Sequence, residues 1–167
     1  MRKVPLILAM VSGGLVVAAC GSDPSAVTNA QLAALQKQAA MYQIDQIEVT
    51  WHKAASTKDL PLMMSIWADD ATLQIKLDTL SGKAEIQNFW AHAAPFDPNN
   101  DWVDETPAYK AVITVSGNTG TIYFECHFVD VPTSKLVALA ATQADVARIN
   151  GRWLITSSIG TTPILSP

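Results

Sequence analysis

Two polar side chains, Gln143 and Asp145, lie two residues apart in a long apolar run of the C-terminal part. Residues two apart on a β-strand point to the same face of a sheet. A carboxylate that faces an apolar interior has a raised pKa and can donate a hydrogen bond or exchange a proton. The alternative is an outward aspartate paired across the sheet. Asp145 is therefore the best candidate for a catalytic residue, and Gln143 is the candidate that should share its face.

His127 is a second candidate for proton transfer. One alternating set of residues on its predicted strand is apolar: Ile122, Phe124, Cys126 and Phe128. We expect this set to face the helices, which places Tyr123, Glu125 and His127 on the outer face, toward solvent or a dimer interface. If the strand were turned the other way, these three would form an acid–base cluster. With the apolar set inside, Cys126 is predicted to be a small buried hydrophobe rather than a nucleophile.

No metal site or cofactor is predicted. The histidines lie on separate predicted elements without His-x-x-x-His spacing: His52, His92 and His127. Three residues are spaced like the start of a calcium-binding loop: Asp97, Asn99 and Asp101. Trp102 stands where that loop needs glycine, and Ala108 stands where it needs a bidentate glutamate, so a solvated acidic loop is the better interpretation. The sequence also lacks a nucleophile elbow, a phosphate-binding loop and a dinucleotide fingerprint.

The N-terminal residues have the pattern of a secretory signal. Arg2 and Lys3 precede the apolar stretch 4–17, which is too short for an ordinary transmembrane helix, and small residues lead to Cys20. The run Val17-Ala18-Ala19-Cys20 resembles the lipobox of bacterial lipoproteins. This resemblance implies cleavage before Cys20, lipidation of its sulfur, and anchoring to a bacterial membrane with the domain facing the periplasm or the cell exterior. The alternative is a soluble secreted protein in which Cys20 is incidental.

Composition narrows the possible partners of the exported part. The chain has 11 basic and 15 acidic residues, a net charge of −4, and no basic cluster after Lys3. This balance argues against binding to nucleic acid and against electrostatic binding to anionic lipid. If Cys20 is lipidated, Cys126 has no intramolecular disulfide partner.

We expect a signal peptide at 1–19, a lipid-anchored tether at 20–28, one domain at 29–162 and a tail at 163–167.

The periodicity of apolar residues predicts helices first and strands afterwards. Thr28 or Asn29 is expected to cap a helix that runs to about Thr57 and whose part up to Ala40 stands away from the domain. Two shorter helices are expected to begin near Asp59 and Gly82. Strands are predicted at 71–77, 109–116, 121–131, 136–149 and 152–159, with a loop at 95–107. This order indicates an α+β domain.

Three stretches, within 47–73, 80–90 and 145–155, carry a resemblance to a known superfamily. Their characteristic segments are Trp67-Ala68-Asp69-Asp70-Ala71, Gly82-Lys83-Ala84-Glu85-Ile86 and Gly151-Arg152-Trp153. Together they resemble the SnoaL-like and ketosteroid-isomerase-like members of the nuclear transport factor 2-like superfamily. The resemblance implies a cone-shaped, curved antiparallel sheet wrapped around three N-terminal helices, with a pocket at the mouth of the cone.

The resemblance does not carry over a catalytic set. Ketosteroid isomerases use a tyrosine, a protonated aspartate and a second carboxylate as base. The tyrosine position falls on Trp51 and the base position on Ile75, so only Asp145 matches. Ser157 and Ile159 stand where many SnoaL-like relatives carry histidines. The isomerase mechanism is therefore rejected.

The aromatic residues favour a binding site for a small apolar molecule. Five of them are expected to converge on the cone interior, with Gln143 and Asp145 as polar anchors: Trp51, Trp67, Phe89, Phe124 and Phe128. For each one a filled core is the alternative. The leading hypothesis is a lipoprotein without a known catalytic set that binds a small hydrophobic molecule or a protein partner. The second is a cyclase- or isomerase-type enzyme that uses Asp145, and the third is a homodimer formed through the convex sheet.

Overall fold

The computed structural model describes residues 28–105 and 110–160. The predicted signal peptide (1–19), the lipidation site Cys20, nearly all of the tether (20–28) and the tail (163–167) lie outside the described residues. Within the described ranges, no helix combines the length and the apolar character needed to cross a membrane.

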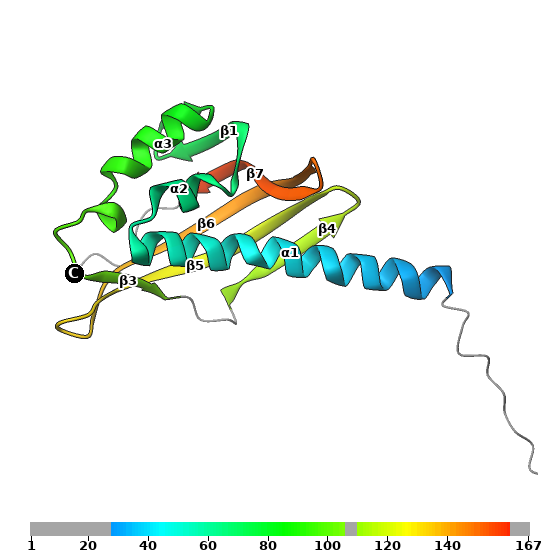
Figure 1. Cartoon of the computed structure of the whole chain (residues 1–167), viewed down its shortest axis with the longest axis horizontal. Coiled ribbons are helices and arrows are strands. Elements are labelled where there is room, and N and C mark those ends of the chain that lie inside the picture. Colours follow the sequence, from blue (N-terminus) through cyan, green and yellow to red (C-terminus); the bar gives the residue numbers. More distant parts are fainter. Residues whose placement is uncertain (1–27, 106–109, 161–167) are drawn as a thin grey trace, which may run out of the picture.

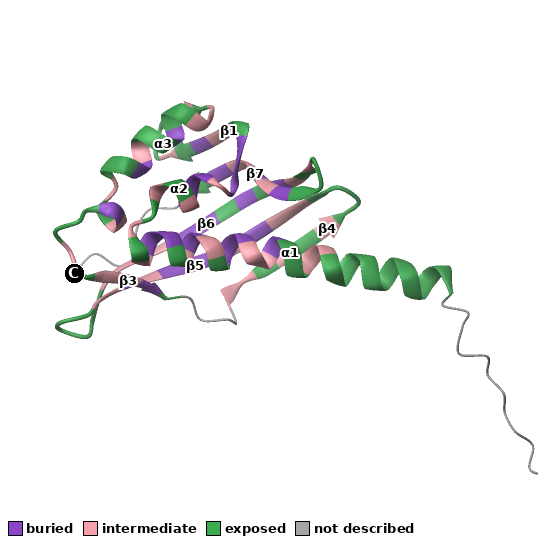
Figure 2. Ribbon diagram, in the orientation of Figure 1, coloured by how far each residue is buried: buried purple, intermediate pink, exposed green. Residues whose placement is uncertain are grey.

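Helix α1 (Asn29–Thr57) crosses one face of the sheet and extends beyond it at its N-terminal end (Figure 1). A capping box begins it: Thr28 Oγ1 accepts a hydrogen bond from the Gln31 backbone N–H at 3.2 Å, and the Gln31 side chain accepts one from the Thr28 N–H at 2.8 Å. Residues 28–39 are exposed, which confirms that this part stands away from the domain (Figure 2). The buried stripe begins at Ile44 and includes Ile47 and Trp51.

The next elements are short and cover one end of the sheet. They are α2 (Leu60–Met64), β1 (Trp67–Ile75), β2 (Asp78–Ser81), α3 (Lys83–His92) and the 3-10 helix η1 (Ala94–Phe96). The Asp59 side chain caps α2 by accepting a hydrogen bond from the Leu62 N–H at 2.8 Å. Strand β1 begins four residues earlier than predicted, because Trp67 already pairs with Ile155.

The remaining strands are β3 (Trp102–Glu105), β4 (Val112–Ser116), β5 (Thr119–Asp130), β6 (Lys135–Ile149) and β7 (Arg152–Gly160). Strand β3 corrects the predicted loop at 95–107. Its four residues pair with the end of β5, from Trp102 opposite Asp130 to Glu105 opposite His127. A strand this short, among proline, asparagine and aspartate residues, has no recognisable alternation of its own, and it forms because β5 offers it a free edge.

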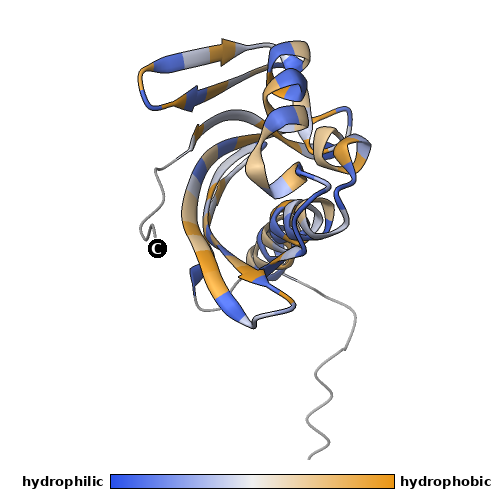
Figure 3. Ribbon diagram, turned by 90° about the vertical axis from the view of Figure 1, so that its left-hand side faces the viewer, coloured by the Kyte–Doolittle hydropathy of each residue, from blue (hydrophilic) through white to orange (hydrophobic). Residues whose placement is uncertain are grey.

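Within the described residues, seven strands form one sheet in the order β2-β1-β7-β6-β5-β3, with β4 pairing the other half of the same edge of β5. Every pairing is antiparallel except that of β1 with β7, which is parallel. The sheet curves, and the helices lie on its concave side (Figure 3). This arrangement confirms the predicted α+β class and the helix-filled curved sheet.

Trp51 is the centre of the aromatic core between α1 and the sheet. Its ring centroid lies 5.9 Å from that of Trp67 on β1, 4.9 Å from Trp90 on α3 and 5.3 Å from Phe124 on β5. The contacts with Trp90 and Phe124 are close to perpendicular, at 85° and 79°, which is a favourable geometry for aromatic pairs. One side chain thus joins three separate elements to α1.

Ile86 anchors α3 and is completely buried. We expect Ile86→Ala to lower the free energy of unfolding by about 2–5 kcal/mol, because the truncated side chain leaves a cavity under the helix. Urea denaturation followed by circular dichroism measures this change. Leu77→Ala is the matched control, since Leu77 is 98% exposed and its truncation should change stability by less than ~0.5 kcal/mol. Equal effects of the two substitutions would contradict the anchoring role of Ile86.

Candidate functional site

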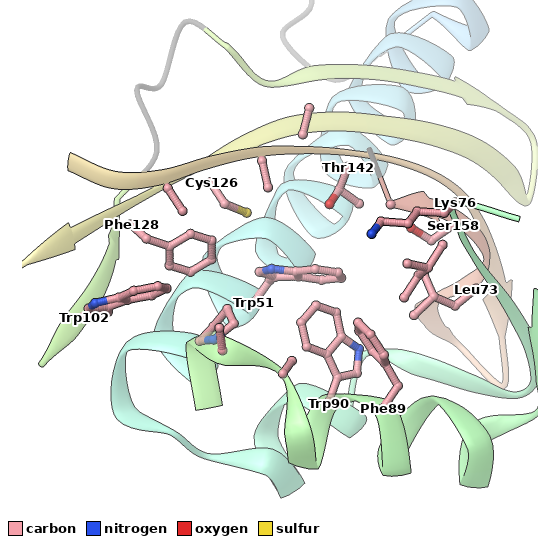
Figure 4. A pocket seen from close by; sticks show the side chains of 18 residues that line it. Trp51, Leu73, Lys76, Phe89, Trp90, Trp102, Cys126, Phe128, Thr142 and Ser158 are labelled. Atoms are coloured by element: carbon pink, nitrogen blue, oxygen red, sulfur yellow. The ribbon is translucent and has the colours of Figure 1, made fainter. Parts of the chain in front are cut away.

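A cavity of about 420 Å³ lies between the helices and the concave face of the sheet (Figure 4). This volume lies within the range of sites for small molecules. Five aromatic side chains form much of its wall: Trp51, Phe89, Trp90, Trp102 and Phe128. They come from α1, α3, β3 and β5, so the pocket exists only when these four elements are assembled.

Small residues on β6 account for the space opposite the aromatic side chains. Ala138, Ala140 and Ala141 line the pocket on the side of the sheet. Protein interiors are normally packed to the density of organic crystals, with few voids larger than a water molecule. A strand of alanine facing large aromatic rings therefore leaves a cavity where larger aliphatic side chains would have produced a filled core.

The two ends of the pocket differ in chemistry. Trp102 and Phe128 make one end apolar, with their rings 6.1 Å apart. At the other end lie Lys76, Thr142 and Ser158 (Figure 4). Ser158 is 2% exposed, and its Oγ has no hydrogen-bond partner among the described residues. Because a buried hydroxyl without a partner costs free energy, this end offers an unused position for a polar ligand atom.

The sequence profile of the SnoaL-like domain matches residues 36–159, which is most of the chain and includes every element that builds the pocket. The chain belongs to the SnoaL-like domain family. This match confirms the resemblance inferred from the sequence. A search of curated proteins found no match.

Solved structures of similar fold come from several bacteria. A protein from Novosphingobium aromaticivorans, described as NTF2-like with a cystatin-like fold, has 16% identity and a TM-score of 0.67, covering 80% of this chain and 89% of that one. An NTF2-like protein of unknown function from Pseudomonas putida has 16% identity and a TM-score of 0.66, covering 78% and 98%. A hexachlorocyclohexane dehydrochlorinase from Novosphingobium barchaimii has 16% identity and a TM-score of 0.62, covering 80% and 96%. At this identity the likeness establishes the fold alone.

In this SnoaL-like domain, three of the five aromatic residues expected at the site line the pocket: Trp51, Phe89 and Phe128. Trp67 and Phe124 do not line it, because both are completely buried in the core. Trp90 and Trp102 were missed. Trp90 lies on the helix predicted to begin near Gly82 but was not assigned to the site, and Trp102 was placed in a loop.

Asp145 and Gln143 lie on the outer face of the SnoaL-like domain, so the prediction that they anchor a ligand inside the cone is wrong. Both side chains are exposed. Asp145 Oδ2 accepts a hydrogen bond of 2.7 Å from Ser157 Oγ on the neighbouring strand, which is the outward pairing considered as the alternative. The reason is the two-residue period of β6: the alternating residues Ala144 and Val146 are the buried ones.

Strand β5 has the predicted orientation. Cys126 and Phe128 line the pocket, whereas Tyr123, Glu125 and His127 lie on the other face. The Tyr123 hydroxyl donates to Glu125 Oε1 at 3.1 Å, His127 Nε2 lies 3.3 Å from Glu125 Oε2, and Lys110 Nζ lies 3.2 Å from Oε1. These contacts lower the pKa of Glu125, and the contact with His127 contributes most. Whether this face also forms a dimer interface stays a prediction.

A second group of polar side chains, unexpected from the sequence, lies between α1 and strands β3 and β5. His52 Nε2 lies 3.6 Å from Asp104 Oδ1, and the Cys126 thiol also contacts Asp104. Burial raises the pKa of Asp104 to about 8 and lowers the pKa of His52 to about 4. Burial also raises the pKa of the Cys126 thiol. At neutral pH all three groups are therefore mainly uncharged. The group could not be predicted, because Asp104 lies on the strand mistaken for a loop.

The raised pKa of Asp104 predicts that stability falls as the pH rises through neutrality. The folded chain holds this proton more tightly than the unfolded chain, so the advantage is lost as the pH approaches 8. Glu48, with a pKa raised to about 7, also makes the free energy of unfolding fall as the pH rises toward that value. His52, with a lowered pKa, makes the free energy of unfolding rise with pH, but only below about pH 6.5. Between about pH 6.5 and pH 8.5, we expect Asp104 to reduce the free energy of unfolding by ~2 kcal/mol.

Urea denaturation at the two pH values, in buffer with EDTA, measures this slope. Asp104→Asn should flatten it, because the amide keeps the shape of the side chain without a titrating proton. Asp145→Asn is the matched control, because it makes the same exchange at an exposed position away from the buried group. An Asp104→Asn variant with the wild-type slope would show that the buried carboxyl is not the titrating group.

Proposed function

We propose that this SnoaL-like domain binds a small, largely apolar molecule that carries one polar or anionic group. The observation that carries the proposal is the pocket with two unlike ends. An apolar end at Trp102 and Phe128 faces an end where the Ser158 hydroxyl, beside Thr142 and Lys76, is buried without a hydrogen-bond partner in the described part of the chain.

The apolar walls supply the affinity expected for such a ligand. Aromatic side chains line most of the cavity, and burial of apolar surface against them is favourable at about 25 cal/mol per Å². A few polar groups placed in an otherwise apolar pocket set the orientation of a ligand. Ser158 and Thr142 can donate hydrogen bonds, and Lys76 adds a positive charge at the same end, so a carboxylate is the group that fits best.

The comparison with solved structures supports a ligand of this kind. One structural neighbour is described as a hexachlorocyclohexane dehydrochlorinase, a name that specifies a small apolar substrate. The shared fold can thus enclose molecules of this size.

Binding is better supported than turnover. Cys126 and Lys76 are the lining residues with ionisable side chains among those described, and burial raises the pKa of the Cys126 thiol, which keeps it protonated. The enzyme hypothesis depended on Asp145, which faces away from the pocket. We therefore propose a carrier or sensor of an apolar molecule rather than a cyclase or isomerase.

An apolar fluorescent probe tests the proposal. The full chain should bind 8-anilinonaphthalene-1-sulfonate at one site, with increased and blue-shifted emission. Ala140→Phe should weaken binding at least ~10-fold, because the new ring occupies the cavity. Gln143→Phe is the matched control on the exposed face of the same strand and should bind like wild type. Equal binding by wild type and Ala140→Phe would refute the pocket as the site.

The neutral probe N-phenyl-1-naphthylamine separates the two ends of the pocket, because it has the same aromatic body without the sulfonate. Lys76→Gln should weaken the binding of the anionic probe several-fold and leave the binding of the neutral probe unchanged. If Lys76→Gln changed neither probe, the anionic group would have to be dropped from the proposal.

We further propose that the domain acts outside the cytoplasm on a lipid anchor at Cys20. The support is the sequence alone: Arg2 and Lys3, the apolar stretch 4–17, and the small residues before Cys20. Several acyl chains together hold a protein stably to a membrane, whereas one chain does so only marginally.

Metabolic labelling with radioactive palmitate tests the anchor. The wild-type chain, expressed in a bacterium, should incorporate label and sediment with membranes. Cys20→Ser should lose the label and leave the membrane fraction, because it removes the sulfur that carries the diacylglycerol. Cys126→Ser is the thiol control and should remain labelled. Labelling of the Cys20→Ser variant would contradict the anchor.

A further inference from the structure

Three side chains of the kind that bind metals meet beside the pocket, and one of them, Cys126, also lines it. His52 on α1, Asp104 on β3 and Cys126 on β5 each offer one ligand atom, and these atoms all lie within 4.8 Å of one another. His52 Nε2 and Asp104 Oδ1 are 3.6 Å apart. Residues 52, 104 and 126 are brought together only by the packing of α1 on the β3–β5 pair.

The carboxylate of Asp104 lacks the partners that a buried carboxylate normally has. Its side chain is 0% exposed, and neither oxygen makes a hydrogen bond of full geometry with any described residue. Weaker interactions with the Cys126 thiol and the His127 backbone hold its pKa down only in part. A buried polar group without a hydrogen-bond partner costs free energy, and a cation that takes the place of the Asp104 proton would satisfy both oxygens.

The donor set indicates the kind of cation. Imidazole nitrogen, carboxylate oxygen and thiolate sulfur together are typical zinc ligands, whereas magnesium and calcium prefer oxygen alone. His52 is in the right state for ligation, because its lowered pKa keeps the ring neutral at pH 7. Its ring also contacts the backbone carbonyls of Glu48 and Glu125, and a carbonyl that accepts the second ring N–H is the usual orienting partner of a ligating histidine.

We propose that His52, Asp104 and Cys126 bind a zinc ion between α1 and the sheet, beside the pocket that Cys126 lines. Zinc bonds of about 2.0–2.3 Å separate tetrahedral ligand atoms by roughly 3.3–3.8 Å. The 3.6 Å between His52 Nε2 and Asp104 Oδ1 already fits this range. All the ligand atoms lie within 4.8 Å of one another, so no pair has to approach by more than about 1.5 Å. Cys126 binds as thiolate and Asp104 as carboxylate, and the proton of each group leaves to solvent. The sequence predicted no metal site, because spacing along the chain cannot show that three elements converge.

Glu48 supplies a further polar group beside the proposed ion. It lies one helical turn before His52, is 7% exposed, and its Oε2 has no hydrogen-bond partner among the described residues. Its charge raises the pKa values of both Asp104 and Cys126, so it lies close to both. A tetrahedral zinc ion needs a fourth ligand, and a water molecule held by the Glu48 carboxylate can occupy that position.

Cobalt(II) is the probe for this site, because it replaces zinc and is coloured. The full chain, treated with chelator and then dialysed, is titrated with cobalt chloride. We expect one equivalent to produce a thiolate-to-cobalt charge-transfer band in the near ultraviolet and tetrahedral bands in the visible range. Zinc chloride should then abolish both, and zinc should raise the thermal unfolding temperature.

Variants separate this site from incidental binding. Cys126→Ser should remove the charge-transfer band, and Asp104→Asn should weaken zinc binding by at least the ~10- to 100-fold typical of a lost partner at a metal site. His127→Gln, on the opposite face of β5, and Cys20→Ser, at the other cysteine, should retain the band. Circular dichroism shows whether each variant is folded. A folded wild type without the band, or a Cys126→Ser variant that keeps it, would overturn the proposal.

Discussion

The burial of the Trp51 indole between α1 and the sheet is the interaction on which the rest of the structure depends. Its ring packs against Trp67, Trp90 and Phe124, which belong to β1, α3 and β5. Part of the same ring lines the pocket, and its N–H donates to the Cys126 sulfur. A single side chain therefore positions the helix, the pocket wall and the buried polar group relative to one another.

The pocket follows from the contrast between this aromatic cluster and the small residues of β6. The rings are held by their contacts with one another, so they cannot collapse onto Ala138 and Ala140. Large side chains on the strand would have filled the space, as most protein cores are filled. The cavity is thus a property of the residue sizes on facing elements, and the fold family by itself does not determine it.

Much of the fold could be predicted from local patterns, but the site could only partly be predicted. The periodicity of apolar residues located α1, and alternation along β5 gave its inward face correctly. Strand β6 carries alanines on both faces, so its hydropathy gave no comparable signal and Asp145 was assigned a possible inward position. Strand β3 is defined by its pairing with β5 rather than by its own residues. The group around Asp104 depends on that pairing and was therefore invisible in the sequence.

The central claim is that the pocket holds a small apolar molecule with one anionic group. Native mass spectrometry of the full chain tests this claim most directly. The protein would be incubated with a panel of aromatic and aliphatic carboxylic acids and their methyl esters, and then released from detergent in the gas phase. The account predicts one-to-one adducts that favour the acids over the esters and that are absent from Ala140→Phe. A wild-type chain that retains no member of the panel, or adducts that persist in Ala140→Phe, would contradict it.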